Sequence, residues 1–144
     1  MRMNFLFIAK IIQRFRSADR QTRLELLLDY SQKLPPLPAH LIAARDQGLN
    51  RVHECQSPVY LYLEPENGGV RLYADAPREA PTVRGFVSVL QRAIQDAPAA
   101  EAAALPVDLL EQLGLAEALG MTRMQGLTAI VGRIRRMAAE MAGS

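Results

Sequence analysis

Val59-Tyr-Leu-Tyr-Leu63 and Val70-Arg-Leu-Tyr73 are two short runs of aromatic and branched residues, and Glu64-Pro-Glu-Asn-Gly-Gly69 joins them. Residues of this kind favour strands. The Asn-Gly step in the joining segment is typical of a tight hairpin turn, because both residues accept a positive φ. The sequence therefore predicts a β-hairpin over residues 59–73. Residues 51–54 are expected to add a third short strand, since a lone hairpin is only marginally stable in water.

A helix is predicted before this sheet, over residues 20–33. Asp19 precedes it and suits the N-cap position, where its carboxylate can accept a hydrogen bond from a free backbone amide. The helix must end at Leu34-Pro-Pro-Leu-Pro38, because the prolines remove backbone donors. A long connection then leads to Asn50. The residues predicted to line the buried face of this helix are Leu24, Leu27, Leu28 and Ser31.

Residues 1–18 are predicted to form an N-terminal helical extension. Its apolar residues would share one face of a helix. A signal peptide is not indicated, because Lys10 interrupts the apolar stretch and no small-residue cleavage site follows. We therefore expect a cytoplasmic protein. The residues on the apolar face of this first helix are Phe5, Ile8, Ile12 and Phe15.

The chain after the hairpin is predicted to be helical. Pro81 stands near the start of one helix, where its missing amide costs little. Two short helices are expected over residues 99–104 and 106–113, and a last one over residues 123–141 with Thr122 as its N-cap. Helices, then strands, then helices predict an α+β fold in which helices pack on one face of a small antiparallel sheet of about three strands. The periodic apolar residues of the helix after Pro81 are Val83, Phe86, Val87, Leu90 and Ile94.

Composition narrows the functional classes. The chain has 144 residues, of which 49% are hydrophobic and 22% charged, so a single folded domain over residues 1–144 is expected. A single cysteine excludes an internal disulfide and a four-cysteine zinc site, and two histidines add no zinc spacing, so no metal or cofactor is predicted. The net charge of +2 gives no reason to expect nucleic acid as a partner. No apolar run approaches the roughly 18 residues of a membrane span, so no membrane partner is predicted.

Cys55 is the one position that suggests chemistry. It lies between the expected third strand and the hairpin, so it is predicted at the tip of a tight loop, where a nucleophile can be both held and reached. The thiolate is the reactive form, and the free thiol has a pKa of about 8.5, so nearby cations would favour it. Arg51, His53 and the distant Arg123 are the candidate cations, whereas the Glu54 carboxylate would oppose ionisation.

The residues alone leave other interpretations open. A free cysteine is most often buried and inert. Cys55 with His53 or His40 would form a hydrolase dyad, but neither an orienting group nor an oxyanion hole is evident. Cys55 and His53 show no metal-ligand spacing. The arginines of residues 133–136 are more typical of a solvated helix face than of a nucleic-acid site.

Several motifs in one order resemble a known family, the SufE proteins, which are sulfur acceptors for cysteine desulfurases in iron–sulfur cluster assembly. The resemblance covers most of the chain, from about residue 19 to residue 142. It implies an α+β fold similar to those of SufE and IscU. The motifs are Leu34-Pro-Pro-Leu37, Asn50-Arg-Val52, Cys55-Gln-Ser57, Val59-Tyr-Leu61, Ala74-Asp75, Val83-Arg-Gly-Phe-Val87, Leu113-Gly-Leu115 and Thr122-Arg-Met-Gln-Gly-Leu127.

The resemblance implies that Cys55 accepts sulfane sulfur from a SufS- or CsdA-like cysteine desulfurase as a persulfide, stimulates that enzyme, and passes the sulfur to a Suf scaffold complex. The chain would be an activator and carrier rather than a stand-alone enzyme. Gln56 and Ser57 follow the cysteine as in the family, and Arg123 matches the arginine of the family's Ser-Arg-x-x-Gly-Leu stretch. His53 and Arg51 are the other supporting residues. We expect Cys55 to rest partly buried and to emerge in the complex.

Three positions depart from the family pattern. Glu54 replaces the usual glycine, Pro58 follows Ser57, and Tyr60 replaces the usual tryptophan. A glycine before the cysteine would permit a φ that glutamate tolerates poorly. A non-catalytic interaction domain that has lost sulfur transfer is therefore the alternative function. The sequence does not fix the oligomeric state, and a homodimer stays open.

Overall fold

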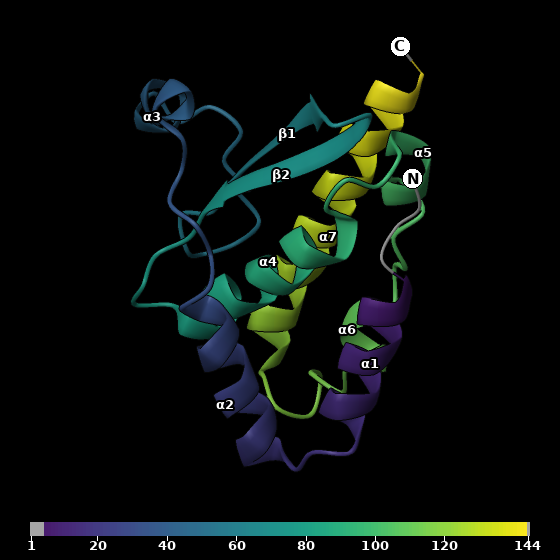
Figure 1. The fold of residues 1–144 in the computed structure, drawn as a ribbon. Coiled ribbons are helices and arrows are strands. Elements are labelled where there is room, and N and C mark those ends of the chain that lie inside the picture. The colour runs from purple at the N-terminus through teal and green to yellow at the C-terminus, as the bar shows by residue number, and fades with distance from the viewer. Residues whose placement is uncertain (1–4, 144) are drawn as a thin grey trace.

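The computed structural model describes residues 5–143, and it confirms the α+β fold (Figure 1). A two-stranded antiparallel hairpin lies beside the long C-terminal helix; the helix of residues 39–46 lies level with the hairpin, and most of the other helices lie below it in this view. The side chain of Phe5, predicted on the first apolar face, lies outside the described part of the chain. The elements are α1 (Phe5–Arg16), α2 (Arg20–Ser31), α3 (Ala39–Asp46), β1 (Tyr60–Glu66), β2 (Gly69–Asp75), α4 (Pro81–Ile94), α5 (Ala99–Ala102), α6 (Leu109–Gln112) and α7 (Met121–Ala142).

The predicted hairpin is confirmed, and its two faces differ in character. Asn67 and Gly68 both have positive φ, 55° and 77°, so they supply the left-handed turn that the sequence predicts. Leu61 pairs with Ala74 and Leu63 with Leu72, which directs these apolar residues to one face. That face packs against α4 and α7. The other face carries the aromatic and charged pairs Tyr60–Asp75, Tyr62–Tyr73 and Glu64–Arg71.

The predicted third strand is wrong. The segment before Cys55 makes only an isolated bridge, between Arg51 and Tyr60, and the sheet has two strands. The amide of Val52 donates to the carbonyl oxygen of Val59 at 2.9 Å, but the amide of Cys55 already donates back to the carbonyl oxygen of Val52 at 3.2 Å. The chain therefore turns before a longer ladder can form.

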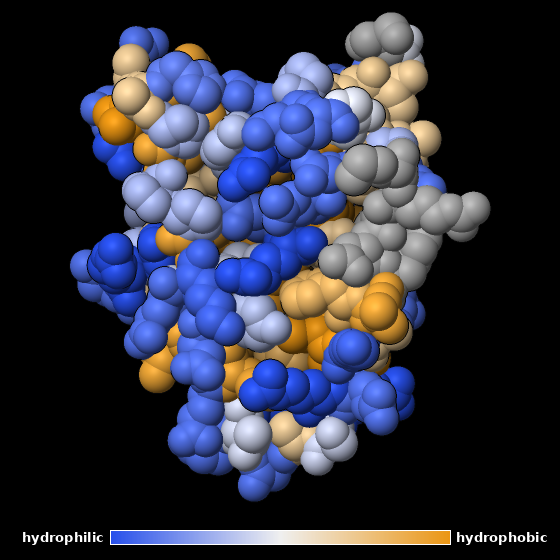
Figure 2. All heavy atoms as spheres, viewed as in Figure 1, coloured by the Kyte–Doolittle hydropathy of each residue, from blue (hydrophilic) through white to orange (hydrophobic). Residues whose placement is uncertain are grey.

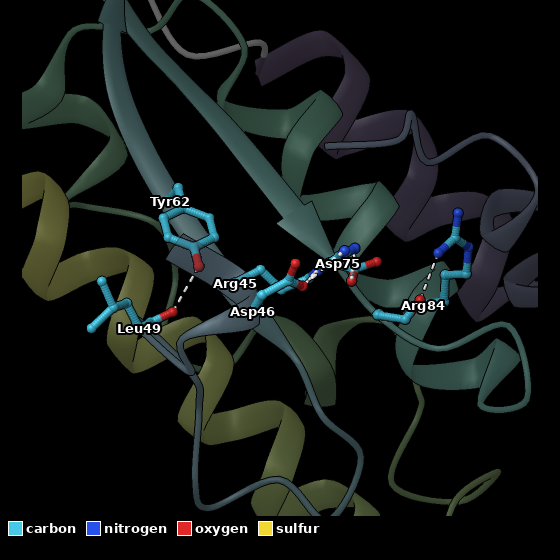
Figure 3. Close-up of polar contacts among 7 residues, drawn as sticks. Arg45, Asp46, Leu49, Tyr62, Asp75 and Arg84 are labelled. Carbon is cyan, nitrogen blue, oxygen red and sulfur yellow. Dashed lines mark hydrogen bonds and ion pairs between the residues drawn. The ribbon is translucent and has the colours of Figure 1, made fainter. Parts of the chain in front are cut away.

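The two helices α2 and α4 form the tightest contact of the core. A Cβ atom placed on Gly85 would lie 2.0 Å from the carbonyl oxygen of Leu27, so only glycine permits this approach. Beside it, the buried Arg84 guanidinium donates to the carbonyl oxygens of Ser31 at 2.9 Å, Ala76 at 2.6 Å and Leu34 at 3.2 Å. Burial lowers the pKa of Arg84. Figure 3 shows one of these bonds, and together they hold the proline-containing segment onto α4.

Helix α3 lies in the connection that the sequence analysis left without structure, and it lies by the polar face of the hairpin. Arg45 Nη1 is 3.1 Å from Asp75 Oδ2, and the Tyr62 hydroxyl donates to the carbonyl oxygen of Leu49 at 2.7 Å (Figure 3). The bonds to Asp75 and Asp46 raise the pKa of Arg45. The helix is short and begins after Pro38 without a side-chain cap, so its sequence signal is weak.

Several helix details differ from the predictions. The Asp19 cap is confirmed: Asp19 Oδ1 accepts from the amide of Thr22 at 2.8 Å, and this bond lowers the pKa of Asp19. Helix α7 begins earlier than predicted, with Gly120 rather than Thr122 at its N-cap. Leu28, predicted to be buried, is 47% exposed. On α2 the buried apolar residues are Leu26, Leu27 and Tyr30, and on α1 they are Ile8, Ile11 and Phe15, with Ile12 half-buried.

Polar side chains cover most of the viewed face over the hairpin, whereas apolar side chains reach the surface lower down, around α1 and α2 (Figure 2). Within the described residues, no helix has the length and apolar character needed to cross a membrane.

Candidate functional site

Cys55 lies in a loop that is closed at its base. The bond from the Val52 amide to the Val59 carbonyl oxygen closes it on one side, and the Leu61 amide donates to the Asn50 carbonyl oxygen at 3.2 Å just beyond. Residues 53–58 therefore project from a paired base. The Cys55 side chain is turned inward, and the residue is only 5% exposed. The thiol is free.

Gly126 of α7 makes the close contact with Cys55. A Cβ atom built on Gly126 would lie 3.2 Å from the Cys55 Sγ atom and 3.3 Å from its Cα atom. Glycine weakens a helix interior, so its presence in the middle of α7 needs a local reason. The reason here is the approach of the cysteine loop to the helix backbone.

A cavity of about 210 Å³ opens beside the thiol. Three segments that are distant in the sequence meet there: the cysteine loop, the start of α4 with the residues before it, and the first turns of α7. The lining mixes apolar and polar groups and includes one cation and one carboxylate. Its residues are Cys55, Gln56, Ser57, Glu79, Ala80, Val83, Thr122, Arg123 and Gly126.

Arg123 and Glu79 supply opposite charges to this cavity. Arg123 Nη1 donates to the Thr82 hydroxyl at 2.7 Å, which fixes the guanidinium at the start of α4. A guanidinium near a thiol favours the thiolate, and a carboxylate disfavours it. Both charged side chains line the cavity that also contains the Cys55 thiol, so the cavity offers charges of both signs to a group bound there.

The structure brings together some of the predicted site residues and leaves others apart. Cys55, Gln56, Ser57 and Arg123 line one cavity. The described lining includes neither Arg51 nor His53, whose side chain is exposed, so their supporting role stays a prediction.

Glu54 is exposed and lies outside the described lining. Among the described residues other than glycine, positive φ occurs only at Asn50, Asn67 and Asp96. The backbone at Glu54 therefore does not require a glycine in this resting conformation.

Sequence reasoning missed Glu79 and gave Gly126 no role. Glu79 has no sequence signal, because only the packing of α4 brings it near the loop. Gly126 did carry one, since a glycine inside a strongly periodic helix often marks a close backbone approach.

No site for a metal is apparent in residues 5–143, which contain no group of three or more His, Cys, Asp or Glu side chains suited to one.

Comparison with known proteins defines the class of this fold and site. The family model SufE, described as an Fe-S metabolism associated domain, matches residues 9–138. The chain belongs to the SufE family.

Individual relatives support this family assignment. An uncharacterized SufE-like protein of Mycobacterium tuberculosis is 38% identical over 134 residues, which cover 92% of each chain. The sulfur acceptor protein CsdE of Escherichia coli is 35% identical over 106 residues, covering 72% of this chain and 68% of CsdE. The solution structure of a hypothetical protein from Thermus thermophilus superposes over the whole of both chains with a TM-score of 0.82 and 30% identity.

Proposed function

We propose that this protein is a sulfur acceptor in iron–sulfur metabolism and that Cys55 carries the sulfur as a persulfide. The observation that carries the proposal is the placement of the free Cys55 thiol in a cavity of about 210 Å³ that also contains Arg123. Membership of the SufE family and the similarity to CsdE support it.

The reaction needs only one cysteine in this chain. The Cys55 thiolate attacks the outer sulfur of a persulfide on the cysteine desulfurase. A bond forms between Cys55 Sγ and that sulfur, the sulfur–sulfur bond in the donor breaks, and its electron pair leaves with the donor cysteine as a thiolate. No oxidant or reductant is consumed, because the transferred sulfur keeps its oxidation state. The persulfide then passes to an acceptor by the same exchange, and we propose a Suf scaffold complex for that role.

The cavity suits the resting and loaded forms of such a carrier. Cys55 is only 5% exposed, which shields its sulfur from reductants in the solvent. Because the loop is paired only at its base, residues 53–58 can move without breaking the hairpin. We propose that the loop swings outward when the desulfurase binds. We propose a cytoplasmic location, where thiols stay reduced.

Mass spectrometry after incubation with a cysteine desulfurase and cysteine tests this proposal. Cys55 should gain the mass of one sulfur atom, and a reductant should remove it. Cys55→Ser should gain none and should stay folded, because a hydroxyl replaces a thiol of similar size. Binding of the desulfurase should survive, since affinity depends on a wider surface. A folded wild-type chain that binds and yet gains no sulfur would favour the alternative, an interaction domain without transfer.

A further inference from the structure

A second concavity lies next to the Cys55 cavity, between α2 and the start of α7. It is a groove of about 420 Å³, a size typical of sites that enclose a ligand or side chains. Its apolar lining comes from Leu24, Leu28, Ala118 and Leu119. Leu28 is 47% exposed, so much of this side chain lies outside the core.

The charges of the groove have one sign. Its described lining contains two arginines, Arg20 and Arg123, and no carboxylate. Within the described part of the chain, the Arg20 side chain has no hydrogen-bond or ion-pair partner. The neighbouring acid Glu117 is 3.4 Å from Arg23, which partly neutralises it. An occupant that combines an apolar side chain with flanking carboxylates would match this lining.

The groove is continuous with the candidate site through Arg123. This residue lines both the groove and the Cys55 cavity. Thr82, which accepts the hydrogen bond from Arg123, also lines the groove. A partner seated in the groove therefore contacts a residue that also lines the Cys55 cavity.

We propose that this groove docks the cysteine desulfurase, through an apolar side chain of that enzyme flanked by acidic residues; the inference rests on the function proposed above. The desulfurase is the occupant because its persulfide must reach Cys55, and the groove adjoins the cavity of that thiol through Arg123. A desulfurase bound in the groove contacts Arg123. Because Arg123 also lines the Cys55 cavity, binding of the donor can affect that cavity.

The test measures binding to a purified cysteine desulfurase that the wild-type chain stimulates. Leu28→Glu should weaken binding by at least about tenfold, because a buried apolar contact is lost and a carboxylate meets the acidic partner. Arg20→Glu should weaken it less, with an effect that fades as salt rises. Arg20→Lys should retain most of the affinity.

Ile42→Glu on α3 is the matched control. Ile42 is also an exposed aliphatic residue on a helix, 39% exposed, and it is not among the groove residues; its helix α3 lies away from α2 (Figure 1). This variant should bind within about twofold of wild type, as expected for a surface change outside an interface. Urea unfolding should show that each variant is folded. Normal binding by Leu28→Glu, or equal weakening by Ile42→Glu, would overturn the inference. So would weaker binding of Leu28→Glu to a scaffold complex alone.

The docking proposal and the sulfur-transfer proposal can be tested separately. At saturating concentrations the groove variants should still gain the persulfide on Cys55, because the groove does not touch the reacting sulfur. If Cys55 of the wild type gains no sulfur although binding depends on Leu28, the proposed transfer is wrong, and the docking of the desulfurase in the groove is still supported. If the wild type is loaded and Leu28→Glu binds normally, the groove inference is wrong and the transfer stands.

Discussion

Helices α4 and α7 each bring an arginine and a glycine against another segment. The contact on α4 is buried, whereas the one on α7 lies at the candidate site. On α4, Arg84 is buried and donates to three backbone carbonyl oxygens, while Gly85 lies against the backbone of α2. On α7, Arg123 is exposed with a single hydroxyl partner, while Gly126 lies against the loop of Cys55. In the first joint, each nitrogen of the buried guanidinium has a carbonyl partner. The second leaves a cation and a movable loop available to a partner.

Gly85→Ala should have the largest effect on the α2–α4 joint. The new Cβ atom would lie 2.0 Å from the Leu27 carbonyl oxygen, so the backbones of both helices must separate. We expect a loss of about 3 kcal/mol or more in the free energy of unfolding. Urea denaturation followed by circular dichroism measures it, and stability close to wild type would contradict the close packing of this joint.

Arg84→Met should cost about 2–3 kcal/mol, because the carbonyl oxygens of Ser31, Leu34 and Ala76 lose their buried donor. Burial lowers the pKa of Arg84, but arginine remains charged at all ordinary pH values, so this loss should not depend on pH. The measurement is urea unfolding over a range of pH. Arg78→Met, at an exposed residue just before α4, is the control and should change stability by less than about 0.5 kcal/mol.

Gly126→Ala should act on the thiol rather than on stability. The added Cβ atom would lie 3.2 Å from Cys55 Sγ, which a movable loop can accommodate by a small shift, and alanine strengthens the helix by about 0.5–1 kcal/mol. We expect stability within about 1 kcal/mol of wild type and several-fold faster alkylation of Cys55. Gly132→Ala on the same helix is the control, because its Cβ atom would meet no neighbour within 4 Å. Faster alkylation in both variants would mean that α7 itself, and not the contact at Cys55, sets thiol access.

Arg123→Gln and Glu79→Gln should have the smallest and opposite effects. Removing the cation should slow alkylation of Cys55 at neutral pH by about threefold, and removing the carboxylate should speed it by a similar factor, as for partly exposed charges. Stopped-flow alkylation at low and high salt measures both, and salt should reduce the differences. Two changes of the same sign would show that these side chains act on loop position instead of charge.

Individual elements could be predicted from sequence better than the contacts that join them. The helical spacing of Val83, Phe86 and Leu90 predicted α4, and the Asn67-Gly68 step predicted the hairpin, because both patterns are local. The position of Cys55 in a loop followed from the hairpin that it precedes. Its contact with Gly126 did not, since it depends on how α7 packs across the molecule.

The predictions that were wrong also depended on contacts between different segments of the chain. Residues 51–54 have strand composition, but the early turn at Cys55 stops the pairing. Leu28 fits an apolar stripe, yet the crossing of α2 over α4 turns the stripe toward Leu26 and Tyr30. Helix α3 is stabilised by polar contacts to the hairpin, such as Arg45 with Asp75, which no local pattern shows.

The paired base of the cysteine loop sets a length. Cys55 lies three positions after Val52, where the last ladder bond is made. A fully extended chain spans at most about 3.3–3.6 Å per residue, so the Cys55 backbone can travel only about 10 Å from its anchor while the hairpin stays intact. A donor cysteine buried deeper than this below the surface of its own protein is out of reach. In the transfer proposed above, the donor persulfide must therefore be presented close to the surface of the desulfurase, because the carrier loop is so short.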